Sequence, residues 1–385
     1  MATVVFLINS LGTGGAERAV KAAAVRMRAT DRDVRIFCLE RLGSQITLPS
    51  DIPVTYLSNL SSCSSAFLKL VALPFLAFRL SSSVSRSGAS SVMSHLFRAN
   101  FVNVLARVLA GSRHRTVLVN HTRISRLPDE GLQGRINWIL CRLLYPRADL
   151  VASVSTGASA ECARLLGLPP EKAITLYDPI QAFARSESKG KRVLPQEIIA
   201  IGRLVALKRF EDLIDAFSVI ADEVSGLQLK IVGDGPERTR LEKRAAVSGF
   251  ADRIHFLGQL DEPGRELARS DVFVSTSAVE GFGMAIVEAL ASGVPVISAD
   301  CAYGPREILS PSTDSTHLLE EDADIECAEY GILYPVGSVK ALQKALQYIL
   351  NDGALRNEMS QKGPVRAADF SVARSTAAYE RLLFA

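Results

Sequence analysis

The segment 280–298 restricts more than any other what this chain can fold into. It begins with Glu-Gly-Phe-Gly, continues with apolar residues at the 3.6-residue spacing of a helix, and ends with a glycine followed by Val-Pro-Val-Ile. This order predicts a glycine loop, a helix that begins at Met284 and ends at Gly293, and a buried strand over 294–297. A loop, a helix and a buried strand in succession are typical of a parallel sheet covered by helices.

The glycine loop of this segment has the composition of a site for anions and sugars. Gly281 and Gly283 let the backbone approach a ligand closely, and the first amides of the following helix have no acceptor within it, so they can donate to a phosphate or a sugar hydroxyl. Glu280 and Glu288 place two carboxylates eight residues apart. Each has a structural alternative: Glu280 as an exposed loop carboxylate, and Glu288 as a charge partner in the first helical turn.

Apolar strands alternate with helical patterns along the whole chain. The first half is predicted to contain a strand over 3–8, a glycine loop, a helix over 17–28, and strands over 34–39, 116–119 and 149–154. After a polar break at 183–193, the second half is predicted to contain strands over 198–201, 227–232, 254–257, 272–275 and 294–297. With 385 residues and 41.6 kDa, the chain is long enough for two domains. We therefore expect two doubly wound, Rossmann-like α/β domains with a cleft between them.

The charge is distributed unevenly between the two halves. Residues 1–185 hold 22 lysine and arginine residues against 11 aspartate and glutamate residues, a formal charge of +11, and the remaining residues hold 22 against 30, a charge of −8. The excess of positive charge in the first half indicates an anionic partner, or it serves solubility alone. Nucleic acid is the general candidate, but the cations lie among apolar helices and are not interleaved with aromatic residues. We therefore expect no nucleic-acid partner and prefer an anionic membrane surface.

Segment 66–80 is the candidate for contact with a bilayer. It is apolar and carries cations at Lys69 and Arg79, and Pro74 interrupts it, so it is too short and too broken for a confident transmembrane helix. It could lie on a bilayer surface, or it could be a buried helix of the first domain.

The start of the chain and the cysteines indicate the compartment. The apolar residues 3–8 lead into a glycine loop without the basic region and cleavage site of a signal peptide. Six cysteines are scattered without Cys-x-x-Cys spacing, so no disulfide framework is predicted. We expect a cytoplasmic protein, peripheral at the inner face of the cytoplasmic membrane.

Glu280 and Glu288, with Gly-Phe-Gly between them, resemble the Glu-x7-Glu motif of the retaining family 4 glycosyltransferases, which have the GT-B fold. Segments 11–18, 202–208 and 232–236 are similar to the family's N-terminal glycine loop, its diphosphate-binding Arg/Lys segment and its mid-domain turn. The resemblance covers nearly the whole chain and is most specific over 198–310. It implies an acceptor-binding domain over 1–185, a nucleotide-sugar-binding domain over 186–365, and a C-terminal helix within 366–385 that returns to the first domain.

The resemblance implies catalytic roles in the second half. Arg203 and Lys208 follow the strand 198–201 and would bind the departing diphosphate, whose negative charge grows as the glycosidic bond breaks. Without the motif, two solvated surface cations would be the preferred interpretation. Glu280 would contact the hydroxyls of the transferred sugar.

The resemblance also implies the other donor contacts. The amides of Phe282, Gly283 and Met284 would assist Glu280, and Glu288 would accept hydrogen bonds from the ribose hydroxyls. The backbone near Phe256 and Leu257 would contact the nucleobase, whereas His255 is expected to be structural.

In the first half, the glycine loop and one histidine are implied. Gly14 and Gly15 would meet the β-phosphate side of the donor; a dinucleotide fingerprint is the alternative, but Gly-Thr-Gly-Gly lacks the GxGxxG spacing. His121 corresponds to the histidine that the family places near the sugar O6 and the acceptor. His95 could share the mouth of the cleft, although a lone histidine is more often a surface or capping residue.

No metal or other cofactor is expected. The Asp-x-Asp triplet at 31–33 precedes a strand instead of ending one, and the triplet at 322–324 lies in the acidic stretch 320–329, which is predicted to be a solvated loop. No His, Cys or Asp cluster has metal-ligand spacing. Arg203, Lys208 and helix amides would take the place of the metal cation.

The segment 301–309 bears on the donor. It departs from the Gly-Gly-x-x-Glu form common in the family and resembles the Gly-Pro-x-Glu-Ile variant of bacterial polysaccharide and lipid-linked glycan enzymes, many of which use UDP-sugars. This departure leaves the donor contacts over 303–306 open. The expected function is retaining, metal-independent transfer from a UDP-sugar, with an N-acetylhexosamine as one candidate, to a glycan or polyprenyl-diphosphate acceptor.

Two other functions remain as alternatives. One is a nucleotide-sugar epimerase of the related GT-B type, and the other is a catalytically silent nucleotide-sugar-binding subunit. The presence of Glu280, Arg203 and Lys208 argues against the silent subunit.

Overall fold

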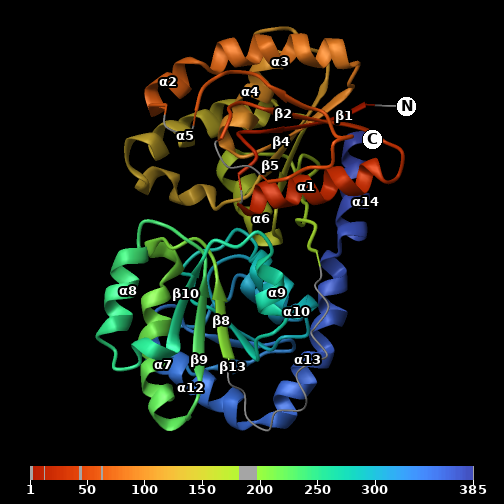
Figure 1. Cartoon of the computed structure of the whole chain (residues 1–385). Helices are drawn as coiled ribbons and strands as arrows, with labels where there is room; N and C mark the ends of the chain where they lie inside the picture. Colours follow the sequence, from red (N-terminus) through yellow and green to blue (C-terminus); the bar gives the residue numbers. More distant parts are fainter. Residues whose placement is uncertain (1–2, 13, 43–45, 62–63, 182–196, 385) are drawn as a thin grey trace. The chain divides into compact units, whose positions relative to one another are not determined.

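The computed structural model describes residues 3–12, 14–42, 46–61, 64–181 and 197–384 (Figure 1). Its contacts divide the chain into two compact units. Unit 1 consists of Met1–Pro179 and Val372–Ala385, and unit 2 of Ile180–Ser371. The expected boundary at 185/186 lies outside the described residues, and residues 366–371, which we assigned to the first domain, are part of unit 2.

Unit 1 contains a seven-stranded parallel sheet in the order β3-β2-β1-β4-β5-β6-β7. The strands are β1 Thr3–Ile8, β2 Asp33–Cys38, β3 Val54–Tyr56, β4 Ser91–His95, β5 Arg115–Asn120, β6 Leu150–Ser153 and β7 Ala173–Thr175. Strands β1 and β4 are buried along their whole length, because helices cover both faces of the sheet. The order reverses between β1 and β4, which is the doubly wound arrangement predicted from the sequence.

The helices of unit 1 include the C-terminal one, as predicted. They are α1 Gly15–Arg28, α2 Ala66–Val71, α3 Leu73–Ser87, α4 Phe97–Val108, α5 Gly131–Leu144, α6 Thr156–Leu166 and α14 Val372–Phe384. Helix α14 packs against α1 and also contacts β4 and β5. It therefore completes the cover of this sheet, although more than 180 residues of the other unit separate it from the rest of unit 1.

The predicted apolar segment 66–80 forms two helices and not one. Pro74 lies at the start of α3, which suits a residue without an amide proton, and the chain passes from α2 to α3 at Ala72. Helix α2 has no buried residue, while α3 buries one face against α4. Of the described helices, none has both the length and the apolar character needed to cross a membrane.

Unit 2 contains a second seven-stranded sheet, in the order β10-β9-β8-β11-β12-β14-β13. The strands are β8 Glu197–Ile201, β9 Gln228–Val232, β10 Ile254–Gly258, β11 Val272–Ser275, β12 Val296–Ala299, β13 Glu326–Cys327 and β14 Ile332–Tyr334. All pairs are parallel except β13 with β14. The stretch 320–329, predicted to be a solvated loop, thus contains an edge strand, because it pairs with a strand that the sequence analysis did not predict.

Helices cover both faces of the second sheet. They are α7 Phe210–Glu223, α8 Arg238–Ala246, α9 Pro263–Leu267, α10 Met284–Ala291, α11 Pro305–Leu309, α12 Val339–Asn351 and α13 Gly353–Ala367. Helix α7 packs against α8 and α12, and α10 packs against α13 and α9. Residues of α7 and α12 form the buried core with the strands, so the carboxyl ends of β8 and β11 are held in a rigid frame.

Candidate donor site

The loop after β8 carries both predicted diphosphate ligands, Arg203 and Lys208. The amide of Gly202 donates to the carbonyl of the last residue of β9 at 3.0 Å, and the amide of Leu204 donates to a carbonyl of the turn after β9 at 2.9 Å. A Cβ atom on Gly233 of that turn would lie 1.9 Å from the Gly202 carbonyl oxygen, and one on its second glycine would lie 2.3 Å from the Leu204 oxygen. The turn therefore needs glycine at both positions, and it holds the loop of Arg203 and Lys208 in place.

Lys208 and Glu280 form an ion pair. The Lys208 Nζ donates to the Glu280 Oε1 at 2.5 Å, and the two side chains are 26% and 15% exposed. Two further bonds join their loops: the Thr276 hydroxyl donates to the Lys208 carbonyl at 2.6 Å, and the Ala278 amide to the Leu207 carbonyl at 2.9 Å. The alternatives for these two residues, a solvated cation and an exposed loop carboxylate, are wrong.

Arg203 lies on the same loop and is exposed. The described part of the chain provides no hydrogen bond or ion pair to its guanidinium. An unpaired cation beside the Lys208–Glu280 pair gives this edge of the sheet a net positive charge among these three groups. A charged group that is not used within the fold is available to a ligand.

The glycine loop 281–283 is shaped by close backbone contacts. Gly283 has a φ of +105° and precedes α10, and a Cβ atom on Gly304 would lie 1.7 Å from the Phe282 carbonyl oxygen. Phe282 is buried and packs edge-on against Phe370 at 5.1 Å between ring centroids. In the described residues, the amides of Gly283 and Met284 donate to no backbone carbonyl. The start of α10 thus carries unused donors at the position predicted for a sugar or phosphate.

Glu288 lies in the second turn of α10 and is only 4% exposed. The alternative of a first-turn charge partner is therefore wrong. Phe256 and Leu257, predicted near the nucleobase, lie half-buried at the carboxyl end of β10, and Phe256 packs against the core of unit 2. His255, expected to be structural, is exposed, and its Nε2 lies 2.7 Å from the Gln228 Oε1.

Arg306 stabilises the fold around the donor loop. Its guanidinium is buried, donates three hydrogen bonds to Asp300, the shortest at 2.6 Å, and also donates to Glu326 at 2.8 Å. These bonds tie α11 to β12 and the edge strand β13. The sequence analysis left the contacts of 303–306 open; at Arg306 they are internal to unit 2.

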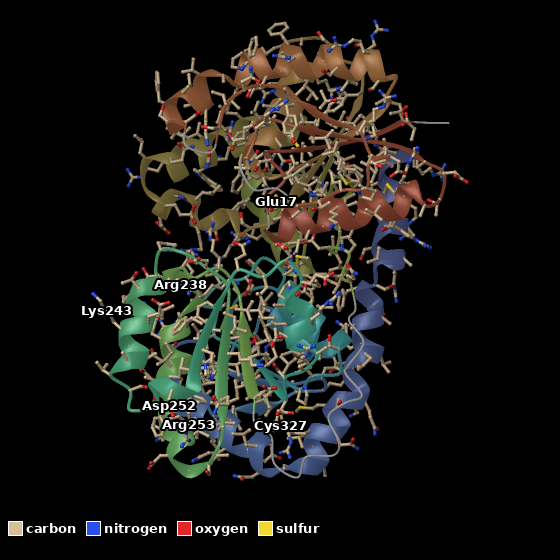
Figure 2. The ribbon with its side chains drawn as sticks, in the orientation of Figure 1. Glu17, Arg238, Lys243, Asp252, Arg253 and Cys327 are labelled. Carbon is tan, nitrogen blue, oxygen red and sulfur yellow. The ribbon has the colours of Figure 1, made fainter. Side chains whose placement is uncertain are left out.

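In unit 1, the predicted glycine loop leads into α1. Gly14 is the N-cap residue of α1 and is exposed, and Gly15 begins the helix. A Cβ atom on Gly14 would lie 2.5 Å from the Glu17 Oε2, so this carboxylate lies over the loop, near the positive end of the helix dipole (Figure 2). The positive end of the helix dipole thus already has a carboxylate of the chain beside it, and the phosphate contact of Gly14 and Gly15 stays a prediction.

His121 directly follows β5 and is paired within unit 1. Its Nε2 lies 2.9 Å from the Nδ1 of His95, the last residue of β4, and its Nδ1 lies 3.3 Å from the Oδ2 of Asp178. His95 is fully buried, so it is not a surface residue. The sequence analysis missed Asp178; its position in Leu176-Tyr-Asp-Pro179, just after a strand, is the signal that could have indicated it.

Among the residues that the structure describes, no three His, Cys, Asp or Glu side chains lie close enough together to hold a metal ion. Asp33 begins β2, as expected for a triplet that precedes a strand. Asp322 and Asp324 are exposed, and Asp324 is paired with Lys344. The metal-independent reaction remains a prediction.

Comparisons with known proteins show the family of the chain. A model of the group 1 glycosyl transferases matches residues 183–366, and one of a glycosyl transferase 4-like domain matches residues 14–177. An N-acetylgalactosamine-N,N'-diacetylbacillosaminyl-diphospho-undecaprenol 4-alpha-N-acetylgalactosaminyltransferase of Campylobacter jejuni is 26% identical over 371 residues, 94% of each chain. The lipopolysaccharide core biosynthesis glycosyltransferase LpsE of Rhizobium meliloti is 30% identical over 187 residues, about half of each chain.

Solved structures share the fold over nearly the whole chain. The sucrose-phosphate synthase of Thermosynechococcus elongatus has a TM-score of 0.80 at 18% identity and covers 99% of this chain and 98% of its own. HepE of Anabaena in complex with UDP has a TM-score of 0.74 at 20% identity, with 100% and 99% covered. The two units therefore define a GT-B glycosyltransferase. The chain belongs to the group 1 glycosyl transferases with a 4-like N-terminal domain, and it is a hexosyltransferase.

Proposed function

We propose that this protein transfers a sugar from a UDP-sugar to a lipid-linked glycan with retention of the anomeric configuration and without a metal. The Lys208–Glu280 pair beside the unused amides at the start of α10 is the observation that carries the proposal. A nucleotide sugar has a diphosphate that needs cations and hydroxyls that need acceptors. This site offers both within two neighbouring loops.

The charges of the site suit a departing diphosphate. As the glycosidic bond breaks, negative charge collects on the diphosphate and positive charge on the sugar ring. Lys208 and Arg203 can neutralise the first, and the Glu280 carboxylate can bind the sugar hydroxyls once Lys208 turns to the phosphate. Lys208 and Glu280 together carry no net charge, because they pair with each other. A diphosphate could replace Glu280 as the partner of Lys208, while the sugar hydroxyls replace Lys208 as partners of Glu280, so that neither charge is left without a partner.

The donor and acceptor classes are proposed from relatives. The Campylobacter relative is named as an N-acetylgalactosaminyltransferase acting on an undecaprenol-diphosphate glycan, and HepE was solved in complex with UDP and glucose. We therefore propose a UDP-N-acetylhexosamine as donor and a polyprenyl-diphosphate glycan as acceptor. Their reaction forms a glycosidic bond and releases UDP.

An anionic membrane surface is proposed as the partner of unit 1. Helices α2 and α3 expose five large apolar side chains, here called the apolar band: Phe67, Leu68, Val71, Phe75 and Phe78. Arg79, which lies over the ring of Phe75 at 5.7 Å, and Arg86 add exposed cations to α3. Residues 52–128, which include both helices, contain no aspartate or glutamate and nine lysine or arginine residues. Apolar side chains flanked by cations without acids suit anionic lipid at the cytoplasmic face.

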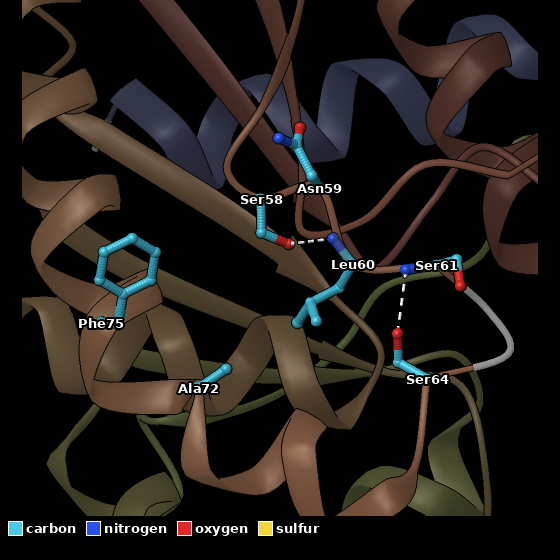
Figure 3. A pocket seen from close by; sticks show the side chains of 7 residues that line it. All are labelled: Ser58, Asn59, Leu60, Ser61, Ser64, Ala72 and Phe75. Atoms are coloured by element: carbon cyan, nitrogen blue, oxygen red, sulfur yellow. Dashed lines mark hydrogen bonds between the residues drawn. The ribbon is translucent and has the colours of Figure 1, made fainter.

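A hollow of about 410 Å³ adjoins the apolar band (Figure 3). Two of its hydroxyls bond within the chain: the Leu60 amide donates to the Ser58 hydroxyl and the Ser61 amide to the Ser64 hydroxyl, both at 3.2 Å. Leu60, Ala72 and Phe75 provide an apolar lining. Because Ser58, Asn59, Ser61 and Ser64 also line it, the hollow offers both apolar and polar contacts next to the apolar band.

Nucleotide release tests the enzymatic proposal. Purified protein is incubated with UDP-, GDP- and ADP-sugars, with and without a polyprenyl-diphosphate glycolipid extract. We expect acceptor-dependent release of UDP, and at least about a hundredfold loss in Glu280→Ala and in Lys208→Ala, or about 2.7 kcal/mol of transition-state stabilisation. The matched controls Asp252→Ala and Lys243→Ala change exposed charges elsewhere on unit 2 and should keep full activity (Figure 2).

Each other outcome points to a different function. Interconversion of two UDP-sugars without an acceptor would support the epimerase. Tight nucleotide binding without turnover of any donor would support the silent subunit.

A further inference from the structure

A chain of buried side chains joins three strands' ends in unit 1. Asp178 follows β7, His121 follows β5 and His95 ends β4. The Asp178 Oδ2 lies 3.3 Å from the His121 Nδ1, and the His121 Nε2 lies 2.9 Å from the His95 Nδ1. All three side chains are at most 8% exposed. Both ring nitrogens of the histidine predicted at the sugar site are therefore engaged within the protein.

The partners dictate where the protons lie. An ionised Asp178 only accepts, so the Nδ1 of His121 carries a proton. In neutral His121 the Nε2 then has none and accepts from the Nδ1–H of His95. Donation thus runs in one direction, from His95 through His121 to Asp178.

At the His95 end of this row of side chains, the described residues offer no further hydrogen-bond partner. The Nε2 of His95 is buried and has no hydrogen-bond partner among the described residues. Its ring lies near the rings of Phe6 and Tyr379, at 6.0 and 6.1 Å between centroids. Burial, together with the neighbouring charge of His121, lowers the pKa of His95 well below its usual value. A neutral His95 with its proton on Nδ1 is the form that fits this surrounding.

At the other end of this row of side chains, Asp178 is held by the C-terminal helix. Tyr379 of α14 is fully buried, and its hydroxyl donates to the Asp178 Oδ1 at 3.4 Å. Ser375, one turn earlier, donates to the Asp178 carbonyl at 3.5 Å. The helix that returns to unit 1 therefore fixes the carboxylate that orients His121.

We propose that His95, Asp178 and Tyr379 are positioning residues that hold His121 in one ring orientation, with the proton of its neutral form on Nδ1. This inference rests on the proposed transferase function and on the family resemblance, which implies that His121 lies near the transferred sugar. A neutral imidazole there does not oppose the positive charge that develops on the sugar ring, as an imidazolium would. A carboxylate that sets the tautomer of a histidine in this way is a recurring device of enzyme sites.

Nitrogen NMR of the full chain tests the proton positions without reference to activity. The chain has five histidines, so ¹⁵N-histidine labelling gives few signals, and His→Gln variants assign them. At about pH 8.5, where an unperturbed histidine is neutral, we expect His121 and His95 to carry their protons on Nδ1. A proton on the Nε2 of His121 would overturn the proposal, as would a His121 tautomer that is unchanged in Asp178→Asn.

Kinetics test the positioning role. In His95→Phe we expect kcat to fall by roughly tenfold or more while KM changes less than about threefold, because His121 loses its donor. Stability should change little, since phenylalanine keeps the ring contacts and removes the unpaired Nε2 of His95, which offsets the Nε2 that it leaves without a donor on His121. His95→Gln, which can still donate, should restore part of kcat. Tyr379→Phe should lower kcat by only a few fold, since Asp178 keeps its other partners.

The control is His114→Gln. His114 is also buried in unit 1 and bonded at both nitrogens, to Ser112 and Asn103, each at 2.7 Å. It should leave kcat unchanged. An unchanged kcat in His95→Phe would overturn the positioning role even with the expected NMR result. Absence of transfer in the wild type would reject the proposed function alone, because the NMR result would still decide the proton positions.

Discussion

The two units share one architecture but cover it with different surfaces. Each has a seven-stranded sheet between layers of helices. On unit 2 the outer helices carry paired charges, such as Arg238 with Glu242 and Lys362 with Glu358. On unit 1, α2 and α3 carry the apolar band, α3 adds the exposed cations Arg79 and Arg86, and α5 exposes Leu132, Ile139 and Leu143.

This difference separates what the fold requires from what function adds. Both sheets need buried strands and helices with one apolar face. Among the described residues, unit 1 also exposes apolar side chains in a continuous stretch of a helix pair, whereas those of unit 2, such as Val219 and Val247, lie far apart in the sequence. A scattered apolar residue needs no explanation, but a group of them does. The difference therefore points to a partner for unit 1 and to a ligand-binding role at the strand ends of unit 2.

The largest loss of activity and stability is expected at a glycine of unit 2 where the backbone leaves no room for a side chain. Gly304 has a φ of +96°, and a Cβ atom there would lie 1.7 Å from the Phe282 carbonyl oxygen. Gly304→Ala should displace the loop 281–283 and lower activity by at least about a hundredfold, with a loss of stability of about 3 kcal/mol or more. Nucleotide release and urea unfolding measure the two effects.

Gly249→Ala is the matched control. Gly249 also has a positive φ, +83°, but no atom lies within 4 Å of the added Cβ. It should cost about 1–2 kcal/mol from backbone strain alone and leave activity intact. Equal effects in both variants would show that strain and not the contact with Phe282 matters.

The next effect concerns the buried charges of unit 2. Arg306→Met leaves Asp300, which is 1% exposed, without its guanidinium partner. Loss of one member of a buried ion pair costs about 3–5 kcal/mol, which urea unfolding monitored by circular dichroism should detect. Lys344→Met, which breaks an exposed pair with Asp324, should change stability little. A small effect of Arg306→Met would mean that water reaches the site in solution.

The histidines give the two units different responses to pH. Burial, together with Arg107, lowers the pKa of His114 in unit 1 to about 4, whereas His255 of unit 2 is exposed. The pKa of a histidine in the unfolded chain is about 6.5. Between that pH and about pH 4, the unfolded chain binds a proton at His114 that the folded chain does not bind, so the free energy of unfolding falls as the pH falls through this range. His114→Gln should remove roughly 3 kcal/mol of this fall.

Trp138, the only tryptophan of the chain, lies on α5 of unit 1. Its fluorescence therefore follows the urea unfolding of unit 1 in the whole protein. Midpoints at about pH 7 and pH 4.5 are compared for His114→Gln and for the control His255→Gln. An unchanged pH dependence in His114→Gln would mean that His114 takes up its proton in the folded state.

The sequence predicted unit 2 better at its site than at its edge. The glycine loop 281–283 follows from local spacing, and Lys208 and Glu280 were named separately from the family resemblance, each just beyond a strand that is easily recognised. That the two side chains pair was not predicted. Strands β13 and β14 were missed because they have two and three residues, which leaves almost no periodicity to detect. Their pairing and the Arg306 bonds depend on the complete sheet.

Unit 1 was predicted less fully for a related reason. His95 and His121 meet because the sheet order places β4 beside β5, and Asp178 reaches His121 from the segment after β7, so no motif spacing indicates this group of side chains. Similarly, hydropathy identified segment 66–80 as apolar but could not decide between burial and a surface location. Which face of α3 the helix α4 covers is a property of the packed domain.

The smallest effect, and the most direct test of the comparison, concerns the apolar band. Phe75 and Phe78 are 57% and 55% exposed. Phe75→Ser with Phe78→Ser should lower partition onto vesicles that contain phosphatidylglycerol about tenfold, because each ring removed takes apolar surface out of the bilayer interface. Vesicles of phosphatidylcholine alone, or high salt, should weaken wild-type binding, since the cations of unit 1 contribute.

Val219→Ser with Val247→Ser on unit 2 is the control and should bind as the wild type does. Equal loss in both pairs would mean that surface hydrophobicity in general, and not unit 1, drives binding; no loss in either would remove the membrane surface as a partner and leave the band for a protein or for the lipid tail of the acceptor.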